Sequence, residues 1–142
     1  MGENEAAAIK QPPRLFAETQ QIIAEIENRL NAPLLCYWNS LGGSIYRNDV
    51  LALYRILEHA GRHDTLYLFI KSDGGSGKEA LRMINLIRSR CNRLVSLIPL
   101  QCASAATMMA IGADEIHMGP MAYLSSVDTS LTHDLSPIDR DN

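Results

Sequence analysis

The feature that most constrains the fold of this chain is an alternation of short apolar runs with longer amphipathic segments. Apolar runs at residues 34–38, 65–71 and 93–100 have the length and character of buried strands. Residues 49–60 and 78–90, which lie between them, carry apolar side chains at helical spacing. Strands that alternate with helices in this way predict right-handed crossovers, and therefore an α/β fold with a largely parallel sheet.

Further elements are predicted at both ends of this pattern. A helix is expected over residues 15–30, and the small residues of 104–113 are expected to form another. The sequence "EIHMG" (115–119) predicts a short strand, whereas residues 123–142 show turn chemistry and no clear element. Asn48 is expected to cap the helix that begins at residue 49. The run at 65–71 alternates too little to be half exposed, so we expect it at the centre of the sheet.

The length of 142 residues allows one domain with one hydrophobic core. Residues 1–13 are polar and end in two prolines, which predicts a disordered or extended N-terminus. Residues 14–142 are then expected to form a single α/β domain. The uncharged stretch at 94–113 is long enough to cross a bilayer, but its polar residues and its change of periodicity favour a buried strand that runs into a buried helix.

Charge and cysteine content exclude several classes of partner. The net charge is −3 and the pI is near 5.8, which argues against a nucleic-acid-binding surface. The arginines that cluster along one helix are expected to form its solvated side; they are Arg82, Arg88, Arg90 and Arg93. Three cysteines without a CxxC pair predict reduced thiols in a cytoplasmic protein, with no zinc site.

Residues 72–80, "SDGGSGKEA", follow the central strand and lead into a helix. A phosphate-binding loop would need glycine at Ser72 and a hydroxyl residue at Glu79, and the dinucleotide fingerprint would need glycine at Ala80. Both nucleotide-binding patterns therefore fail. Glycines at the end of a strand can instead present backbone N–H groups to a developing negative charge, because no Cβ blocks the approach.

Ser104 follows the next strand directly and begins a helix of small residues. The helix N-terminus supplies free N–H groups, including that of Ala105, and a positive partial charge. This placement is similar to the nucleophile elbow of hydrolases, although the GxSxG motif is absent. The alternative is that Ser104 only caps the helix and the glycines only form a turn. Their joint placement at the ends of two strands connected by one helix favours catalysis.

Two longer stretches carry a family resemblance. "IKSDGGSGKEALRMINLIRS" and "LIPLQCASAATMMAIGADEIHMGP" resemble the Clp-protease/crotonase superfamily. "SAATMMAIGADEIHMGPMAYLSSVD" and "LSPID" are most similar to its signal-peptide-peptidase and serine-dehydrogenase-proteinase branch. The resemblance covers about residues 34–142. It implies repeated β-β-α units around a largely parallel sheet, with the C-terminal part of the family domain missing from the sequence.

The resemblance also implies a serine peptidase that needs no cofactor. Ser104 would be the nucleophile, and the N–H of Ala105 with a glycine N–H from Gly74-Gly75 would form the oxyanion hole. Gly75, Ser76 and Gly77 would hold a peptide substrate as an added strand. Asp73 stands where the Clp proteolytic subunit has proline, so the loop departs from that subgroup.

The general base is not assigned by the sequence. This branch typically uses lysine, but no lysine follows Ser104, and the three present are Lys10, Lys71 and Lys78. Lys78, His117 and His133 stay open as candidates, as does a lysine beyond Asn142 if the chain is a fragment.

Two other functions stay open: a crotonase-like enzyme for coenzyme A thioesters, and a peptide-binding or assembly module without activity. The resemblance implies a homo-oligomer and allows membrane association without a spanning segment. The first helix and "MMAI" (108–111) are also expected to offer more apolar surface than one small sheet can cover.

Overall fold

The computed structural model describes residues 16–128 and contains a four-stranded, wholly parallel main sheet. Its strands are β1 (Leu34–Trp38), β2 (His63–Lys71), β3 (Cys91–Ile98) and β5 (Glu115–Met118), in the order β1-β2-β3-β5. The α/β class with a largely parallel sheet is therefore confirmed. β2 lies between β1 and β3, as its unbroken apolar run predicted.

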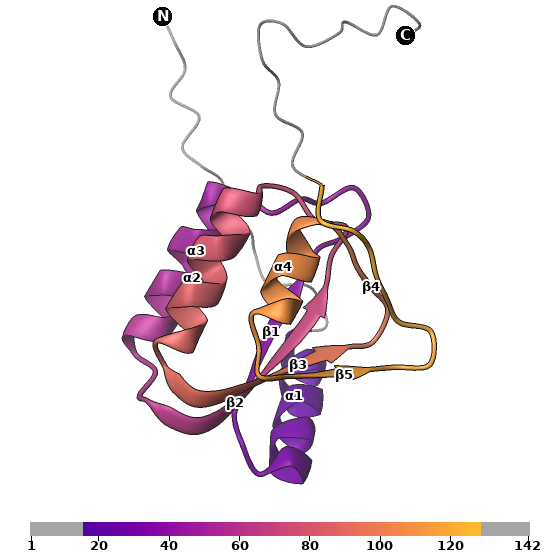
Figure 1. The fold of residues 1–142 in the computed structure, drawn as a ribbon. Coiled ribbons are helices and arrows are strands. Elements are labelled where there is room, and N and C mark those ends of the chain that lie inside the picture. The colour runs from indigo at the N-terminus through magenta and orange to yellow at the C-terminus, as the bar shows by residue number, and fades with distance from the viewer. Residues whose placement is uncertain (1–15, 129–142) are drawn as a thin grey trace, which may run out of the picture.

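Helices cover the two faces of this sheet unequally (Figure 1). α2 (Arg47–Glu58), α3 (Gly77–Arg88) and α4 (Ala105–Ile111) lie on one face, and α1 (Phe16–Leu30) lies on the other. The main core forms between the three helices and the sheet; it includes Leu68, Ile70, Met83, Ile87 and Met109. α1 has no fully buried residue, and Ile22 is 58% exposed. The far face of the sheet is therefore only partly covered.

A second, smaller layer lies beyond the carboxyl ends of the main strands. β4 (Gln101–Cys102) pairs in parallel with β6 (Tyr123–Leu124). Isolated parallel bridges join Ser72 to Cys102 and Ile45 to Gly75. Each main strand is thus followed by a short segment that joins the second layer.

Several local predictions are wrong for physical reasons. The strand expected at 93–100 ends at Ile98, because proline follows and cannot donate to the ladder; the chain then re-pairs as β4. The region from residue 123 onward does contain an element, β6, which is too short to show any periodicity. Asn48 does not cap α2: the helix begins earlier, its N-cap is Tyr46, and the Tyr46 N–H donates to Asp49 Oδ2 at 2.8 Å.

Three further predictions concern the uncharged stretch at 94–113, the cysteines and the exposed apolar surface. The stretch at 94–113 is a strand followed by a helix, and no helix within 16–128 combines the length and apolarity that a bilayer span needs. Cys91 and Cys102 are buried free thiols, and Cys36 is exposed. The apolar surface expected on α1 is exposed, whereas in "MMAI" Met109 and Ala110 are buried and Ile111 is exposed.

Candidate active site

The glycine turn after β2 and the serine turn after β3 meet at the carboxyl edge of the sheet. A Cβ placed on Gly74 would lie 2.8 Å from Ser104 Cβ, 2.7 Å from Ala103 O and 3.1 Å from Ala105 N. Only glycine fits such a close approach, and Gly74 also adopts a φ of 106°. The two segments that sequence analysis singled out, 30 residues apart, are therefore in van der Waals contact.

Ser104 has an unusual backbone conformation, with φ 50° and ψ −121°. A non-glycine residue at positive φ is uncommon, and this ψ lies outside the ordinary left-handed region. Such conformations cost of order 1–3 kcal/mol and cluster at functional sites. A sharp strand-to-helix turn that exposes a serine Oγ is the geometry of a nucleophile elbow.

The side chain of Ser104 does not act as a helix cap. It accepts no hydrogen bond from the first N–H groups of α4, although Ser104 occupies the N-cap position. Ser104 is half-buried. The reading in which this serine serves only to cap the helix is therefore not supported by its contacts.

The strained turn is held from the C-terminal side. The Ser104 N–H donates to Ser125 Oγ at 2.7 Å. Thr107 Oγ1 lies 2.8 Å from Cys102 O and 3.0 Å from Ser125 O, so one hydroxyl joins the start of α4 to the segment after β6. Sequence analysis missed both Ser125 and Thr107, because contacts across 21 and 18 residues leave no local signal.

A second set of hydrogen bonds fixes the glycine turn. Ser72 is 1% exposed, its hydroxyl donates to Asn39 Oδ1, and its Oγ accepts the Gly74 N–H at 3.1 Å. The Ile45 N–H donates to Gly74 O at 2.8 Å. Since the carbonyl and N–H of a trans peptide point in opposite directions, the Gly75 N–H points away from Ile45. That is the side on which Ser72 pairs with Cys102, two residues before Ser104.

Two backbone N–H groups lack an acceptor at the corner, which is the region where the glycine turn after β2 meets the serine turn after β3. Within residues 16–128, no acceptor bonds the N–H of Gly75 or that of Ala105. The Gly74 N–H, by contrast, is used by Ser72. Of the two glycines predicted as donors, Gly75 is thus the one whose N–H is unoccupied, while Gly74 provides the close contact with Ser104.

The predicted substrate-binding residues are partly engaged by the protein itself. The Ser76 N–H donates to Ile45 O at 3.1 Å, and Ser76 Oγ caps α3 by accepting the Glu79 N–H at 3.4 Å. Gly77 is the first residue of α3. One edge of this segment is therefore taken by Ile45, whereas the Gly75 N–H on the opposite edge has no acceptor within residues 16–128.

None of the candidate bases that the structure describes is joined to Ser104. Lys78 is exposed in the first turn of α3, and Lys71 Nζ donates to Asn39 O at 3.2 Å. His117 is exposed on β5, with Nε2 3.2 Å from Glu115 Oε2. His133 and Lys10 lie outside the described residues. Within 16–128, no lysine or histidine side chain hydrogen-bonds Ser104.

A buried cysteine lies beneath the serine turn, and the part of the chain that the structure describes holds no metal-binding cluster. Burial raises the pKa of the Cys102 thiol, beneath the serine turn, to about 12, so it stays protonated. Across residues 16–128, no three histidine, cysteine or acidic side chains converge as metal ligands. No protein-family model matches the sequence, and no curated protein matches it.

Proposed function

We propose that this protein is a serine hydrolase of the Clp/signal-peptide-peptidase type, with the β-β-α units of the Clp/crotonase fold. It would cleave peptide bonds through an acyl-enzyme on Ser104. The observation that carries the proposal is the backbone of Ser104, strained at φ 50° and ψ −121° and packed against Gly74. A serine that only caps a helix needs neither feature.

The reaction follows from the two unoccupied donors. Ser104 Oγ attacks the carbonyl carbon of the substrate while a base takes the hydroxyl proton, and the carbonyl electron pair moves onto oxygen. The N–H groups of Gly75 and Ala105 stabilise that oxyanion. The amine leaves with a proton, and water then hydrolyses the ester. Removal of one such donor typically costs about 100- to 1,000-fold in rate.

We propose that the base comes from outside the described residues, because no lysine or histidine of residues 16–128 bonds Ser104. His133 is the imidazole candidate elsewhere in the chain, and the family resemblance favours a lysine instead. Without a base, the hydroxyl is a weak nucleophile at neutral pH. We therefore expect slow turnover wherever no base reaches Ser104, with the N–H groups of Gly75 and Ala105 still able to speed attack by Ser104.

A peptide-binding or assembly module is the second candidate function. It is favoured by one observation, that no lysine or histidine of residues 16–128 bonds Ser104. Coenzyme A thioester chemistry would use the same two N–H groups to stabilise an enolate and would not require Ser104.

A fluorophosphonate probe separates these functions. The proposal expects a phosphonyl adduct on Ser104, located by peptide mass spectrometry and lost in Ser104→Ala. Ser126→Ala is a matched control, because Ser126 is exposed nearby and its hydroxyl makes no hydrogen bond within the described residues. Binding of a peptide without labelling would support the module, and thioester binding without labelling would support the crotonase-like enzyme. Equal labelling of wild type and Ser104→Ala would contradict the proposal.

A further inference from the structure

β1 is the edge strand of the main sheet, and one side of its backbone is unpaired. Pro33 O accepts the Tyr67 N–H at 3.0 Å, and the Asn39 N–H donates to Lys71 O at 2.9 Å. Because the groups of alternate residues in a strand point to opposite sides, the N–H and C=O groups of Cys36 and Trp38 point away from β2. No other segment of residues 16–128 pairs with that edge.

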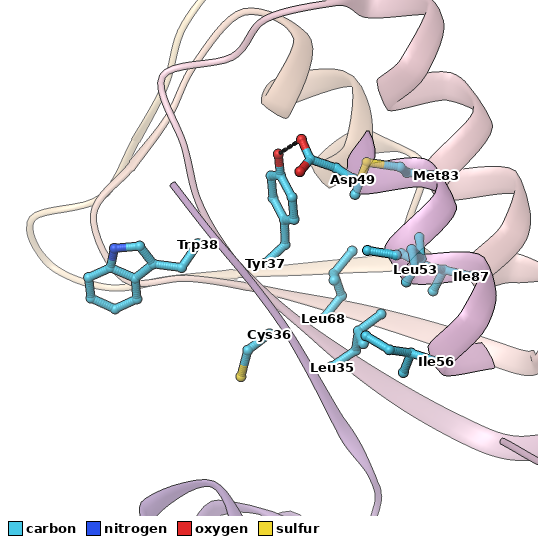
Figure 2. Close-up of a pocket in the computed structure, with 11 residues that line it drawn as sticks. Leu35, Cys36, Tyr37, Trp38, Asp49, Leu53, Ile56, Leu68, Met83 and Ile87 are labelled. Atoms are coloured by element: carbon cyan, nitrogen blue, oxygen red, sulfur yellow. Dashed lines mark hydrogen bonds between the residues drawn. The ribbon is translucent and has the colours of Figure 1, made fainter. Parts of the chain in front are cut away.

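This edge lacks the devices that usually protect an open strand. Its sequence, "LLCYW", contains no charge, proline or glycine, and the strand has no bulge. Trp38 is 59% exposed and Cys36 is exposed. Both side chains lie on the face of the sheet opposite α2 (Figure 2). An accessible apolar edge of this kind is a template for another strand.

A cavity on the opposite face continues the same edge. It has a volume of about 200 Å³ and lies between β1 and α2, where Leu35 lies beside Ile56 and the Tyr37 hydroxyl donates to Asp49 Oδ2 at 3.0 Å (Figure 2). Ile56 is 59% exposed at its rim. The unpaired backbone is therefore flanked by uncovered apolar surface on both faces of the sheet.

We propose that β1 pairs antiparallel with β1 of a second copy of this chain, about a two-fold axis at Cys36. In this register the two Cys36 residues exchange both backbone hydrogen bonds, and each Trp38 N–H reaches the Leu34 carbonyl of the other copy. The Leu34 N–H does not take part, because it donates to Glu27 Oε1 at 2.8 Å. The main sheets of the two copies then form one continuous sheet.

The strand favours a second copy over an unrelated partner because it is complementary to itself. The two-fold axis of an antiparallel pair is perpendicular to the sheet. The helices α2, α3 and α4 of both copies therefore lie on the same face of the joined sheet. The cavity rim at Ile56 therefore faces its own counterpart, and the Trp38 side chain lies beside Leu34 of the other copy. The two-fold pairing therefore covers the exposed apolar surface on both faces of the sheet beside β1.

The register makes a specific prediction for the thiols. Residues that exchange both hydrogen bonds across an antiparallel pair have Cα atoms about 5.5 Å apart, a separation that a disulfide spans. The two Cys36 side chains lie on the same face of the joined sheet. A short bismaleimide should therefore link two chains through Cys36, while Cys91 and Cys102 are buried and should not react.

Three variants at Cys36 test the pairing by light scattering and cross-linking. Cys36→Ser keeps the backbone N–H, so the dimer mass should persist and only the cross-link should be lost. Cys36→Pro removes an N–H that points away from β2, so the fold should survive while the dimer weakens about tenfold or more. Cys36→Glu places like charges opposite each other and should weaken the dimer in a salt-dependent way.

A monomeric mass throughout the micromolar range would overturn the proposal. So would a dimer that forms no Cys36 cross-link, or one whose affinity is unchanged in Cys36→Glu. If circular dichroism shows that Cys36→Pro is unfolded, the serine and glutamate variants decide the outcome by themselves. The dimer does not depend on the chemistry of Ser104, so this test and the fluorophosphonate test can fail separately.

Discussion

The carboxyl-end corner around Ser104 and the free edge of β1 handle their backbone groups in opposite ways. At the corner, Ser72 and Ile45 bond the N–H and C=O of Gly74 and Ser125 bonds the Ser104 N–H, while the N–H groups of Gly75 and Ala105 have no acceptor within residues 16–128. Along β1, unpaired N–H and C=O groups stand in a row beside exposed apolar side chains. The first arrangement suits a small negative charge, and the second suits another strand.

The two regions also differ in their backbones: the corner contains a strained backbone, whereas the edge of β1 contains an exposed one. The corner keeps Ser104 in an unfavourable backbone conformation and Gly74 in one that only glycine adopts readily, and the surrounding hydrogen bonds hold both. The edge has ordinary strand geometry and is simply uncovered. Substitutions at the corner should therefore change stability and reactivity together, whereas substitutions at the edge should change association alone.

The largest expected effect is that of Gly74→Ala. Its Cβ would lie 2.7 Å from Ala103 O and 2.8 Å from Ser104 Cβ, at a backbone φ of 106°. We expect the free energy of unfolding to fall by about 3 kcal/mol or more, measured by urea denaturation. Gly61→Ala is the matched control, because no atom lies within 4 Å of its Cβ position, and it should change stability by less than about 0.5 kcal/mol. Equal effects of the two substitutions would show that the corner is not closely packed.

A smaller effect is expected for Ser72→Ala. The substitution leaves the Gly74 N–H and Asn39 Oδ1 without their buried partner, which should cost about 1–3 kcal/mol of stability. It should also slow fluorophosphonate labelling of Ser104, because the peptide that carries the Gly75 N–H loses its support. Ser40→Ala, at an exposed serine in the loop after β1, should change neither quantity. An unchanged labelling rate in Ser72→Ala would remove Ser72 from the account of the oxyanion site.

Thiol reactivity should differ between the two regions without any mutation. Burial raises the pKa of Cys102 to about 12, and the thiol has no access to solvent. Partial burial, with a contribution from the nearby Glu27 charge, also raises the pKa of Cys36, but its side chain is exposed. At pH 8 a thiol reagent should therefore modify Cys36 at least about 100-fold faster than Cys102. Comparable rates would mean that the corner opens readily.

The sequence predicted the main elements and singled out the two turns, because both rest on local patterns. Apolar runs marked the strands of the main sheet, and glycine with serine at two strand ends marked the corner. Ser104 stands out in the sequence by its position at the start of a helix directly after a strand and by the family resemblance.

The second layer and the supports of the corner could not be predicted in the same way. β4 and β6 contain two residues each, too few for a period of two to be visible. The bond from Ser104 to Ser125 and the bridge from Ile45 to Gly75 join residues that are distant in sequence. The open edge of β1 depends on strand order, which the apolar pattern of a single strand does not encode.

The most direct test of the central claim is a crystal structure of the protein after reaction with a fluorophosphonate. We predict a covalent bond from Ser104 Oγ to phosphorus, with the phosphoryl oxygen within about 3 Å of both the Gly75 and Ala105 nitrogens. A phosphoryl oxygen that points into solvent, or an adduct on a different serine, would contradict the assignment of this corner as an oxyanion site.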